Sequence, residues 1–388
     1  MSSKSFNVSV EPAVLIWARE SIGISTDDEI VKKIVKKIKG ITINTIKEWE
    51  KKDGAVRPTF AQIEQLSTVY KRPLSAFLLP APPKEPPFPK DFRTIPSKEK
   101  QPLKPKTYLA IRKARRFQYS AIELIKELGE ESRKLSIKAN LSDNPETLAE
   151  KVRIQFGIKE FPRITSFTKE TALDEWIKVL ENNGILVFQI SITKNKEIRG
   201  FSLIDDAVPV IALRRSDETS AKIFTLFHEL AHLLLREGGI CDLEESDISS
   251  HEKFCNHFAG AFLVPRDKLL NHSIVKTNAK VREWPENFLR DIARDFYVSR
   301  EVILRRLLML GLTTKEYYLK KHKEWKSKYK EPFVRGKKNE IKICLQERGK
   351  KYTSMAFDAY ERRKIDAIGL ADYLGVTSDK ISKIKEAI

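Results

Sequence analysis

The 388-residue sequence is poor in cysteine and contains no long apolar run. Its three cysteines, Cys241, Cys255 and Cys344, are odd in number and far apart, which is typical of reduced thiols and not of a disulfide framework. No stretch approaches the roughly 20 apolar residues that a membrane-spanning helix needs. The first residues also lack the apolar segment of a signal peptide. These absences argue against a disulfide-stapled secreted domain and a membrane partner, and they predict a cytoplasmic location.

The sequence is rich in positive charge. It carries 72 Lys and Arg residues against 53 Asp and Glu residues, a formal net charge of +19. An excess of this size favours a polyanionic partner, of which nucleic acid is the usual one. The alternative is a lysine-rich surface that is simply solvated. The length allows two to four small domains and at least one well-buried core.

Residues 7–79 are predicted to form a compact helical domain. Short apolar stretches at helical spacing are separated by brief turns, and one predicted helix ends at Gly40. Thr42 and Thr59 each stand directly before such a stretch, in the position of a helix N-cap. Several short helices joined by brief turns are typical of a helix-turn-helix domain.

Three segments of this domain resemble an Xre/cI-type helix-turn-helix. They are Trp-Ala-Arg-Glu at 17–20, Trp-Glu-Lys at 49–51 and Pro-Thr-Phe-Ala-Gln-Ile at 58–63. The resemblance implies sequence-specific DNA binding by the helix at 42–50, with Asn44, Thr45 and Lys47 as base or phosphate contacts. It also raises the expectation of a homodimer, since DNA-reading proteins of this kind are often dimers. A helix-turn-helix fold that serves only protein contacts remains the alternative.

Residues 80–106 are predicted to form a linker. Prolines recur from residue 80 to residue 96. Proline lacks a backbone N–H and restricts its neighbours, so this segment should be extended and semi-rigid.

The remaining chain divides into two regions, 107–285 and 286–388. Within the first, residues 184–192, 199–204 and 208–213 are rich in β-branched and aromatic residues and are bounded by turn residues. They predict a small antiparallel sheet in which the last two runs form a hairpin. Residues 286–388 are predicted to be helical and Lys-rich. Their segment 371–377 resembles another helix-turn-helix, although a helical subdomain packed on the preceding region is the favoured interpretation.

The run Phe-Thr-Leu-Phe-His-Glu-Leu-Ala-His-Leu-Leu-Leu at 224–235 carries the strongest chemical signal. We expect an apolar helix here, capped by Ser216 or Asp217. His228 and His232 are four residues apart, so both imidazoles project from one face and can bind one Zn²⁺. Glu229 lies beside that face, where it can accept a proton without binding the metal.

A third metal ligand is expected on a second helix. Glu252 opens an apolar stretch 20 residues after His232, and Asn256 follows one turn later on the same face. Glu252 would complete a site of two histidines and one carboxylate with an open position for water. Asn256 would hydrogen-bond a ligand imidazole and orient it. The rival ligands are predicted loop residues: Glu244, Glu245, Asp247 and His251. Two core histidines satisfied by ordinary hydrogen bonds are the alternative to a metal site.

Together the helix-turn-helix, the linker ending in Asp-Phe-Arg at 91–93, and the segments 224–232 and 252–265 resemble the ImmA/IrrE family of zinc metallopeptidases, in its long form with an Xre-type domain. The resemblance implies an α+β, mainly α protein with a zincin-like core. It implies His228, His232 and Glu252 as zinc ligands and Glu229 as general base. It also implies a partner repressor or antitoxin as the protein substrate.

Two functional hypotheses follow. In the first, the protein is a zinc metalloendopeptidase whose substrate lies along the edge of the 184–213 sheet. In the second, it is a DNA-binding regulator or antitoxin whose zinc domain senses or scaffolds without proteolysis. His251 and His257 are both candidates for a second oxyanion donor, and the sequence does not choose between them.

Overall fold

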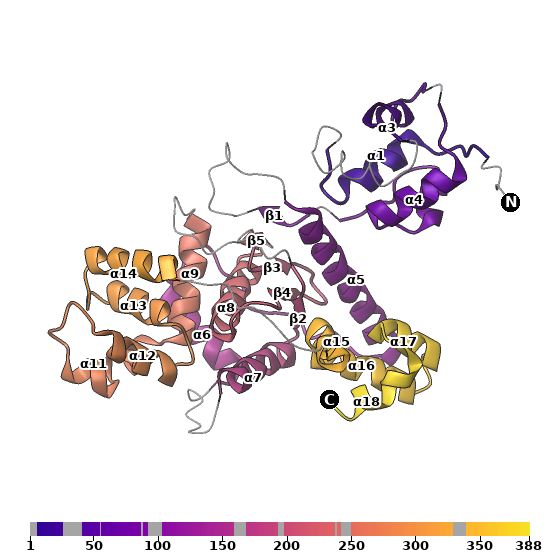
Figure 1. Cartoon of the computed structure of the whole chain (residues 1–388). Helices are drawn as coiled ribbons and strands as arrows, with labels where there is room; N and C mark the ends of the chain where they lie inside the picture. The colour runs from indigo at the N-terminus through magenta and orange to yellow at the C-terminus, as the bar shows by residue number, and fades with distance from the viewer. Residues whose placement is uncertain are drawn as a thin grey trace. The chain divides into compact units, whose positions relative to one another are not determined.

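The computed structural model describes residues 6–25, 41–54, 56–86, 88–91, 103–158, 168–192, 198–236, 239–241, 250–328 and 339–388 (Figure 1). The chain divides into two compact units. The first consists of Met1–Phe88 and Lys100–Arg112, and the second consists of Pro89–Glu99 and Lys113–Ile388. The predicted helix ending at Gly40 and most of the later linker, 92–102, lie outside the described residues. Over the described ranges, no helix combines the length and the apolar character needed to cross a membrane.

The first unit is a small helical bundle. Its elements are α1 (Pro12–Glu20), α3 (Ile43–Trp49), α4 (Phe60–Tyr70) and the short 3₁₀ helix η1 (Leu74–Leu78). Thr42 and Thr59 are the N-caps of α3 and α4, as predicted, and each forms a reciprocal capping box with the residue three positions later. The core is a single cluster that includes Leu15, Trp49 and Phe77.

One buried arginine holds this bundle together. Arg19 on α1 donates to both carboxylate oxygens of Glu50 at the end of α3, over 2.7 and 2.9 Å. Its remaining nitrogen donates to the backbone oxygen of Ile24 over 2.6 Å. Because a buried guanidinium must be paired, these bonds define the arrangement of α1 and α3.

The beginning of the linker packs on the same bundle. Glu85 accepts two hydrogen bonds from Arg72, at 2.6 and 2.8 Å. The Arg72 guanidinium in turn lies 4.0 Å above the ring of Trp17. The first part of the proline-rich segment is therefore held by side-chain contacts.

The second unit contains a mixed, five-stranded sheet. Its strands are β1 (Lys90–Asp91), β2 (Leu186–Ile190), β3 (Gly200–Leu203), β4 (Val210–Arg214) and β5 (Gly239–Cys241), in the order β1-β5-β3-β4-β2. The predicted hairpin is confirmed, since β3 and β4 pair antiparallel. The prediction of a wholly antiparallel sheet is wrong. The strand β2 pairs with β4 in parallel, and β1 pairs with β5 in parallel. Strand composition indicates burial but not the direction of pairing, and β2 bypasses its sequence neighbour to reach β4.

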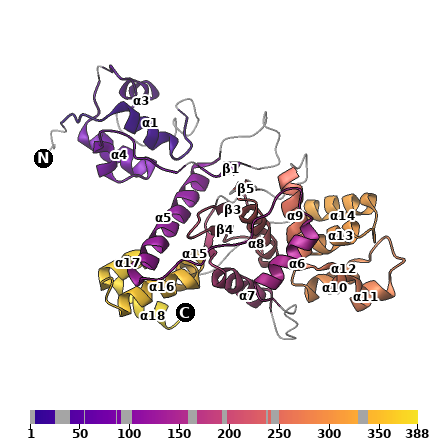
Figure 2. The same ribbon diagram turned by 180° about the vertical axis from the view of Figure 1, so that it is seen from behind.

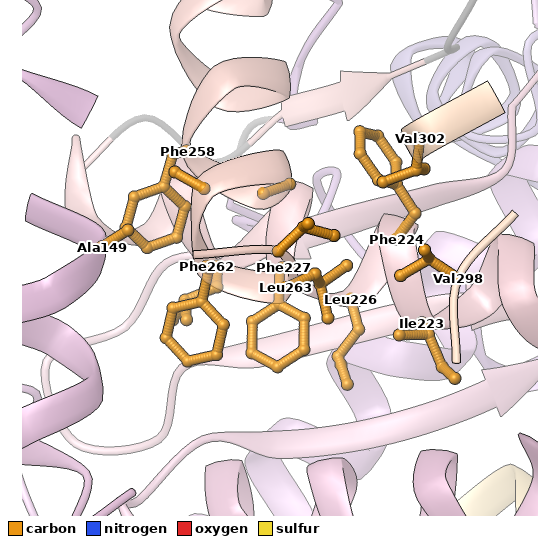
Figure 3. Packing of buried hydrophobic residues seen from close by; sticks show 14 of the residues in the cluster. Ala149, Ile223, Phe224, Leu226, Phe227, Phe258, Phe262, Leu263, Val298 and Val302 are labelled. Atoms are coloured by element: carbon orange, nitrogen blue, oxygen red, sulfur yellow. The ribbon is translucent and has the colours of Figure 1, made fainter. Parts of the chain in front are cut away.

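Two long helices, α8 (Thr219–Leu234) and α9 (Ser250–Leu263), lie against each other beside this sheet. Helix α6 (Pro145–Gln155) packs against α9, and α7 (Lys169–Asn182) packs against α8. Phe117 of α5 (Pro105–Leu128) instead contacts Phe188 of β2. Phe227 of α8 stacks on Phe262 of α9 with ring centroids 4.2 Å apart (Figure 3). Trp176 of α7 meets Phe227 edge-on at 5.1 Å. Aromatic packing therefore fixes the pair of helices in the core.

The start of α8 differs from the expected one. The N-cap is Glu218, which makes no side-chain cap. Asp217, one of the two predicted caps, instead pairs with the buried guanidinium of Arg214 at the end of β4. Ionic pairing across the β4–α8 turn takes the place of the predicted cap, because Arg214 would otherwise be buried without a partner.

Further helices complete this unit (Figure 2). They are α10 (Arg266–Leu270), α11 (Ser273–Thr277), α12 (Glu286–Asp295), α13 (Arg300–Met309) and α14 (Lys315–Lys328), then α15 (Glu340–Arg348), α16 (Lys350–Glu361), α17 (Ala367–Leu374), η2 (Ser378–Lys380) and α18 (Ile381–Lys385). The α15–α16 junction packs on the sheet, because a Cβ at Gly349 would lie only 2.7 Å from the backbone oxygen of Val187 in β2. The protein is thus α+β and mainly α, with a zincin-like domain.

Candidate metal centre

Helix α8 presents both histidines of the His-Glu-Leu-Ala-His motif to one interior point. His228 and His232 have no exposed surface, and their ring centroids are 5.0 Å apart. Their Nε2 atoms are separated by 3.3 Å. An apolar helix that is buried over its whole second half can hold two imidazoles only where another polar group faces them.

That group is Glu252 on α9, which also has no exposed surface. One of its carboxylate oxygens lies 3.2 Å from His228 Nε2, and the other lies 3.3 Å from His232 Nε2. The candidate ligand atoms of the three residues lie within 4.8 Å of one another, so the group could hold a metal ion.

Asn256 orients the first histidine. It lies one turn after Glu252, and its Oδ1 is 3.0 Å from His228 Nδ1. Because an amide oxygen only accepts, Nδ1 carries the proton and the lone pair of Nε2 points at the shared centre. Two imidazole nitrogens and one carboxylate, with a partner that fixes one tautomer, form a donor set that suits a divalent transition metal.

The pKa values of the three groups follow from their proximity. Burial disfavours the imidazolium of His228, but the Glu252 carboxylate and further hydrogen bonds outweigh it and raise the pKa of His228. Burial, together with the charge of His228, lowers the pKa of His232 despite its bond to Glu252. For Glu252, the two histidines overcome burial and hold its pKa well below the usual range. A metal ion would therefore compete with a proton for His228.

Glu229 is buried beside the three ligands, on the side of the sheet. A Cβ placed on Gly200 of β3 would lie 3.3 Å from Glu229 Oε1 and 2.6 Å from Thr225 Cγ2. Any larger residue at position 200 would therefore require the Thr225 side chain to shift. The buried hydroxyl of Thr225, one turn before Glu229, has no hydrogen-bond partner among the described residues.

A buried arginine braces α9 from behind. Arg306 of α13, 1% exposed, pairs with both carboxylate oxygens of Glu146 on α6, at 2.5 and 2.9 Å. Its Nε donates to the backbone oxygen of Val264, at the end of α9, over 3.0 Å. His257 binds the same Glu146 over 2.7 Å. Arg306 and His257 together lower the pKa of Glu146 to about 2 against the opposing effect of burial.

These contacts separate the two oxyanion candidates. His257 is directed to Glu146, away from the metal ligands. His251 is half-buried, and its charge contributes to the lowered pKa of His232. Three of the rival ligands, Glu244, Glu245 and Asp247, lie outside the described residues.

The candidate DNA contacts lie in the first unit. Asn44 and Lys47 are exposed on α3, and Thr45 is half-buried. The hydroxyl of Thr45 is 2.8 Å from that of Thr42 and belongs to the capping box. This capping role of Thr45 was not predicted, because the usual capping box has Glu or Gln three residues after the N-cap.

Three further residues that shape or support this site were not predicted from the sequence: Gly200, Thr225 and Arg306. Gly200 interrupts a strand pattern, which is typical of a close approach by another element. Thr225 is a polar residue within an apolar helix, one turn before Glu229. Arg306 left no comparable signal, because its partner Glu146 is 160 residues away.

Residues 180–308 match the model of the M78 peptidase family, described as the IrrE N-terminal-like domain. The matched range contains all three candidate ligands, Glu229 and the buried Arg306. A comparison of the chain with curated proteins finds no match.

Proposed function

Because residues 180–308 form a peptidase domain of the ImmA/IrrE family, we propose that this protein is a zinc-dependent metalloendopeptidase that cleaves a partner regulatory protein. One observation carries the proposal: His228, His232 and Glu252 converge on one buried point, and the carboxylate of Glu229 lies beside them. Three protein ligands leave a fourth position open, as catalytic zinc sites do.

Zinc is the metal we expect. Two imidazoles and one carboxylate at a buried, compact site suit its preferred tetrahedral geometry. When bound, zinc would supply Lewis-acid chemistry, acidifying a water molecule and polarising the peptide carbonyl.

The protein's own residues have distinct tasks in this reaction. Glu229 accepts the proton of the attacking water and later delivers it to the leaving amine nitrogen. Asn256 holds His228 in the tautomer that directs Nε2 to the centre. Gly200 lets β3 approach the Glu229 carboxylate and limits the space around it.

The first unit provides the expected link to regulation. We propose that it binds DNA through Asn44, Thr45 and Lys47 on α3, of which Asn44 and Lys47 are exposed and Thr45 is half-buried. A peptidase joined to such a unit would act on regulators found at the same DNA, and a repressor- or antitoxin-like protein fits that description. The high net positive charge supports this assignment.

The test compares Glu229→Gln with the unaltered protein. Zinc content is measured by elemental analysis. Peptide hydrolysis is measured by incubating each protein with a cell extract and identifying the new N-termini that appear. We expect one zinc ion per chain in both proteins and at least a ~10³-fold loss of cleavage in the variant, since a general base contributes about 10²–10⁴-fold. Glu218→Gln, at the exposed start of the same helix, is the matched control and should cleave normally.

Two outcomes would reject this function. If Glu229→Gln cleaves as fast as the unaltered protein, Glu229 is not the general base. A biological effect on the regulator that survives Glu229→Gln with zinc retained would favour the second hypothesis, a DNA-binding regulator with a non-proteolytic zinc domain.

A further inference from the structure

Both edges of the four strands β5-β3-β4-β2 are covered by segments from outside residues 180–308. On one side, the α15–α16 junction lies against the backbone of β2, with Gly349 beside the Val187 oxygen. On the other side, β1, which comes from the proline-rich segment, pairs with β5. A sheet edge presents unpaired N–H and C=O groups and will pair with any extended chain that reaches it.

The edge at β5 is the one next to the catalytic groups. Gly200, which approaches Glu229, pairs with Cys241 of β5. One residue along, Phe201 pairs with Ile240, and Ile240 pairs with Asp91 of β1. With neighbouring strands about 4.8 Å apart, β1 lies about 10 Å from the row of Gly200. In sequence order, the short strand β5 follows α8, which carries both histidines, and precedes α9, which carries Glu252.

The strand that occupies this edge is a weak one. Over the part of the chain that the structure describes, it has two residues, Lys90 and Asp91. Pro89 precedes them and has no N–H, so the ladder cannot extend in that direction. A backbone hydrogen bond contributes about 1 kcal/mol net, and parallel pairing is slightly weaker than antiparallel pairing. A longer peptide with more ladder bonds would therefore replace β1.

We propose that the outer edge of β5 is where an extended peptide substrate adds to the sheet, and that Lys90–Asp91 of the same chain occupies it as a tethered competitor. This inference rests on the proposed peptidase function. Recognition through the backbone selects substrates by conformation. A suitable substrate segment is unfolded or lies in a loop, is several residues long and contains no proline. The competitor excludes short or weakly pairing chains, since a short tether gives it an effective concentration in the millimolar range.

The experiment uses the full-length chain in a Glu229→Gln background, so that binding is measured without cleavage. Lys90→Pro with Asp91→Pro removes both N–H donors of β1. The control, Lys90→Ala with Asp91→Ala, removes the side chains and keeps the backbone pairing. The probe is a synthetic eight-residue peptide of alternating Thr and Val with a Lys at each end, free of proline and with blocked ends, whose binding is measured by ligand-observed NMR.

We expect the double-proline variant to bind the peptide about tenfold more tightly than the parent and the double-alanine control. Amide hydrogen exchange at 239–241 should be faster in the double-proline variant, while α8 and α9 keep their protection and zinc stays bound. The same probe peptide with prolines at its two central positions should not bind.

Equal peptide affinity in all three proteins, or unchanged exchange at 239–241, would overturn the inference. Both results are independent of catalysis. If the peptide binds as expected while no protein is ever cleaved, the proposed function fails and the assignment of the edge stands. If cleavage depends on Glu229 but the prolines change nothing, the peptidase function stands and the competitor is rejected.

Discussion

The catalytic helices and helix α3 hold their candidate functional groups in opposite environments. On α8 and α9, His228, His232 and Glu252 have no exposed surface and contact one another. On α3, Asn44 and Lys47 are exposed. A metal site is assembled by folding, so its geometry is complete in the protein alone. The proposed DNA contacts on α3 are accessible side chains, and their geometry would be completed only when DNA is bound.

The difference has an energetic consequence. Substitutions at the buried centre change both chemistry and folding, because each group there is the partner of another. Substitutions on the exposed face of α3 should leave stability nearly unchanged and alter only the interaction with a polyanion. The four predictions below sharpen this contrast, from the largest expected effect to the smallest.

Glu252→Ala should abolish zinc binding. Removing one of three ligands leaves two imidazoles, and we expect the apparent affinity for zinc to fall by at least ~10³-fold. Competition with a chromogenic chelator measures this change. Glu218→Ala, at the exposed start of α8, should bind zinc normally. Stoichiometric zinc in Glu252→Ala under the same competition would show that another residue is the ligand.

Arg306→Met should destabilise the second unit by about 2–4 kcal/mol, since it leaves Glu146 and the Val264 oxygen without their buried donor. Urea denaturation followed by tryptophan fluorescence measures the free energy of unfolding. Arg294→Met, an exposed arginine of α12, should change it by less than about 0.5 kcal/mol. If the two variants are equally stable, Arg306 is not the brace of α9 that the contacts indicate.

Glu181→Gln should remove a pH dependence of stability. Burial raises the pKa of Glu181 from its ordinary 4.5 to about 8, against a hydrogen bond from the Lys351 backbone N–H. Between these values the folded protein keeps a proton that the unfolded chain has lost. The free energy of unfolding of the unaltered protein therefore falls as pH rises from about 4.5 to 8, by on the order of a few kcal/mol.

The amide that replaces the Glu181 carboxyl cannot ionise, so the variant should lose this part of the slope over that window and be more stable than the unaltered protein above pH 8. Thermal unfolding at a series of pH values makes the comparison. Glu175→Gln, exposed on the same helix, should retain the slope. If Glu181→Gln keeps the full slope of unfolding free energy against pH, another group causes that slope.

Lys47→Ala should have the smallest effect on the protein and act only on DNA binding. We expect an unchanged melting temperature and a reduction of about 1 in the slope of log affinity against log salt, as for loss of one phosphate contact. Fluorescence anisotropy with a labelled duplex measures the slope. Lys52→Ala, exposed just after α3, is the control. An identical slope in both variants would remove Lys47 from the interface.

The local features of the centre were predictable because they depend on spacing along one helix. A four-residue interval places His228 and His232 on one face whatever surrounds them. The same reasoning placed Asn256 beside Glu252 and the caps Thr42 and Thr59 at their helices. Direction of strand pairing was not predictable, since a β-branched run is equally compatible with parallel and antiparallel neighbours.

The residues that could bind a metal ion are predictable from the sequence alone, because ligand type and helical period are properties of the chain. Three contacts depend instead on folding: Glu252 reaches both histidines, Gly200 faces Glu229, and Lys90–Asp91 pairs with β5. Those contacts join residues that are distant in sequence, so they arise only when the core of α8, α9 and the sheet closes and each buried polar group must find its partner.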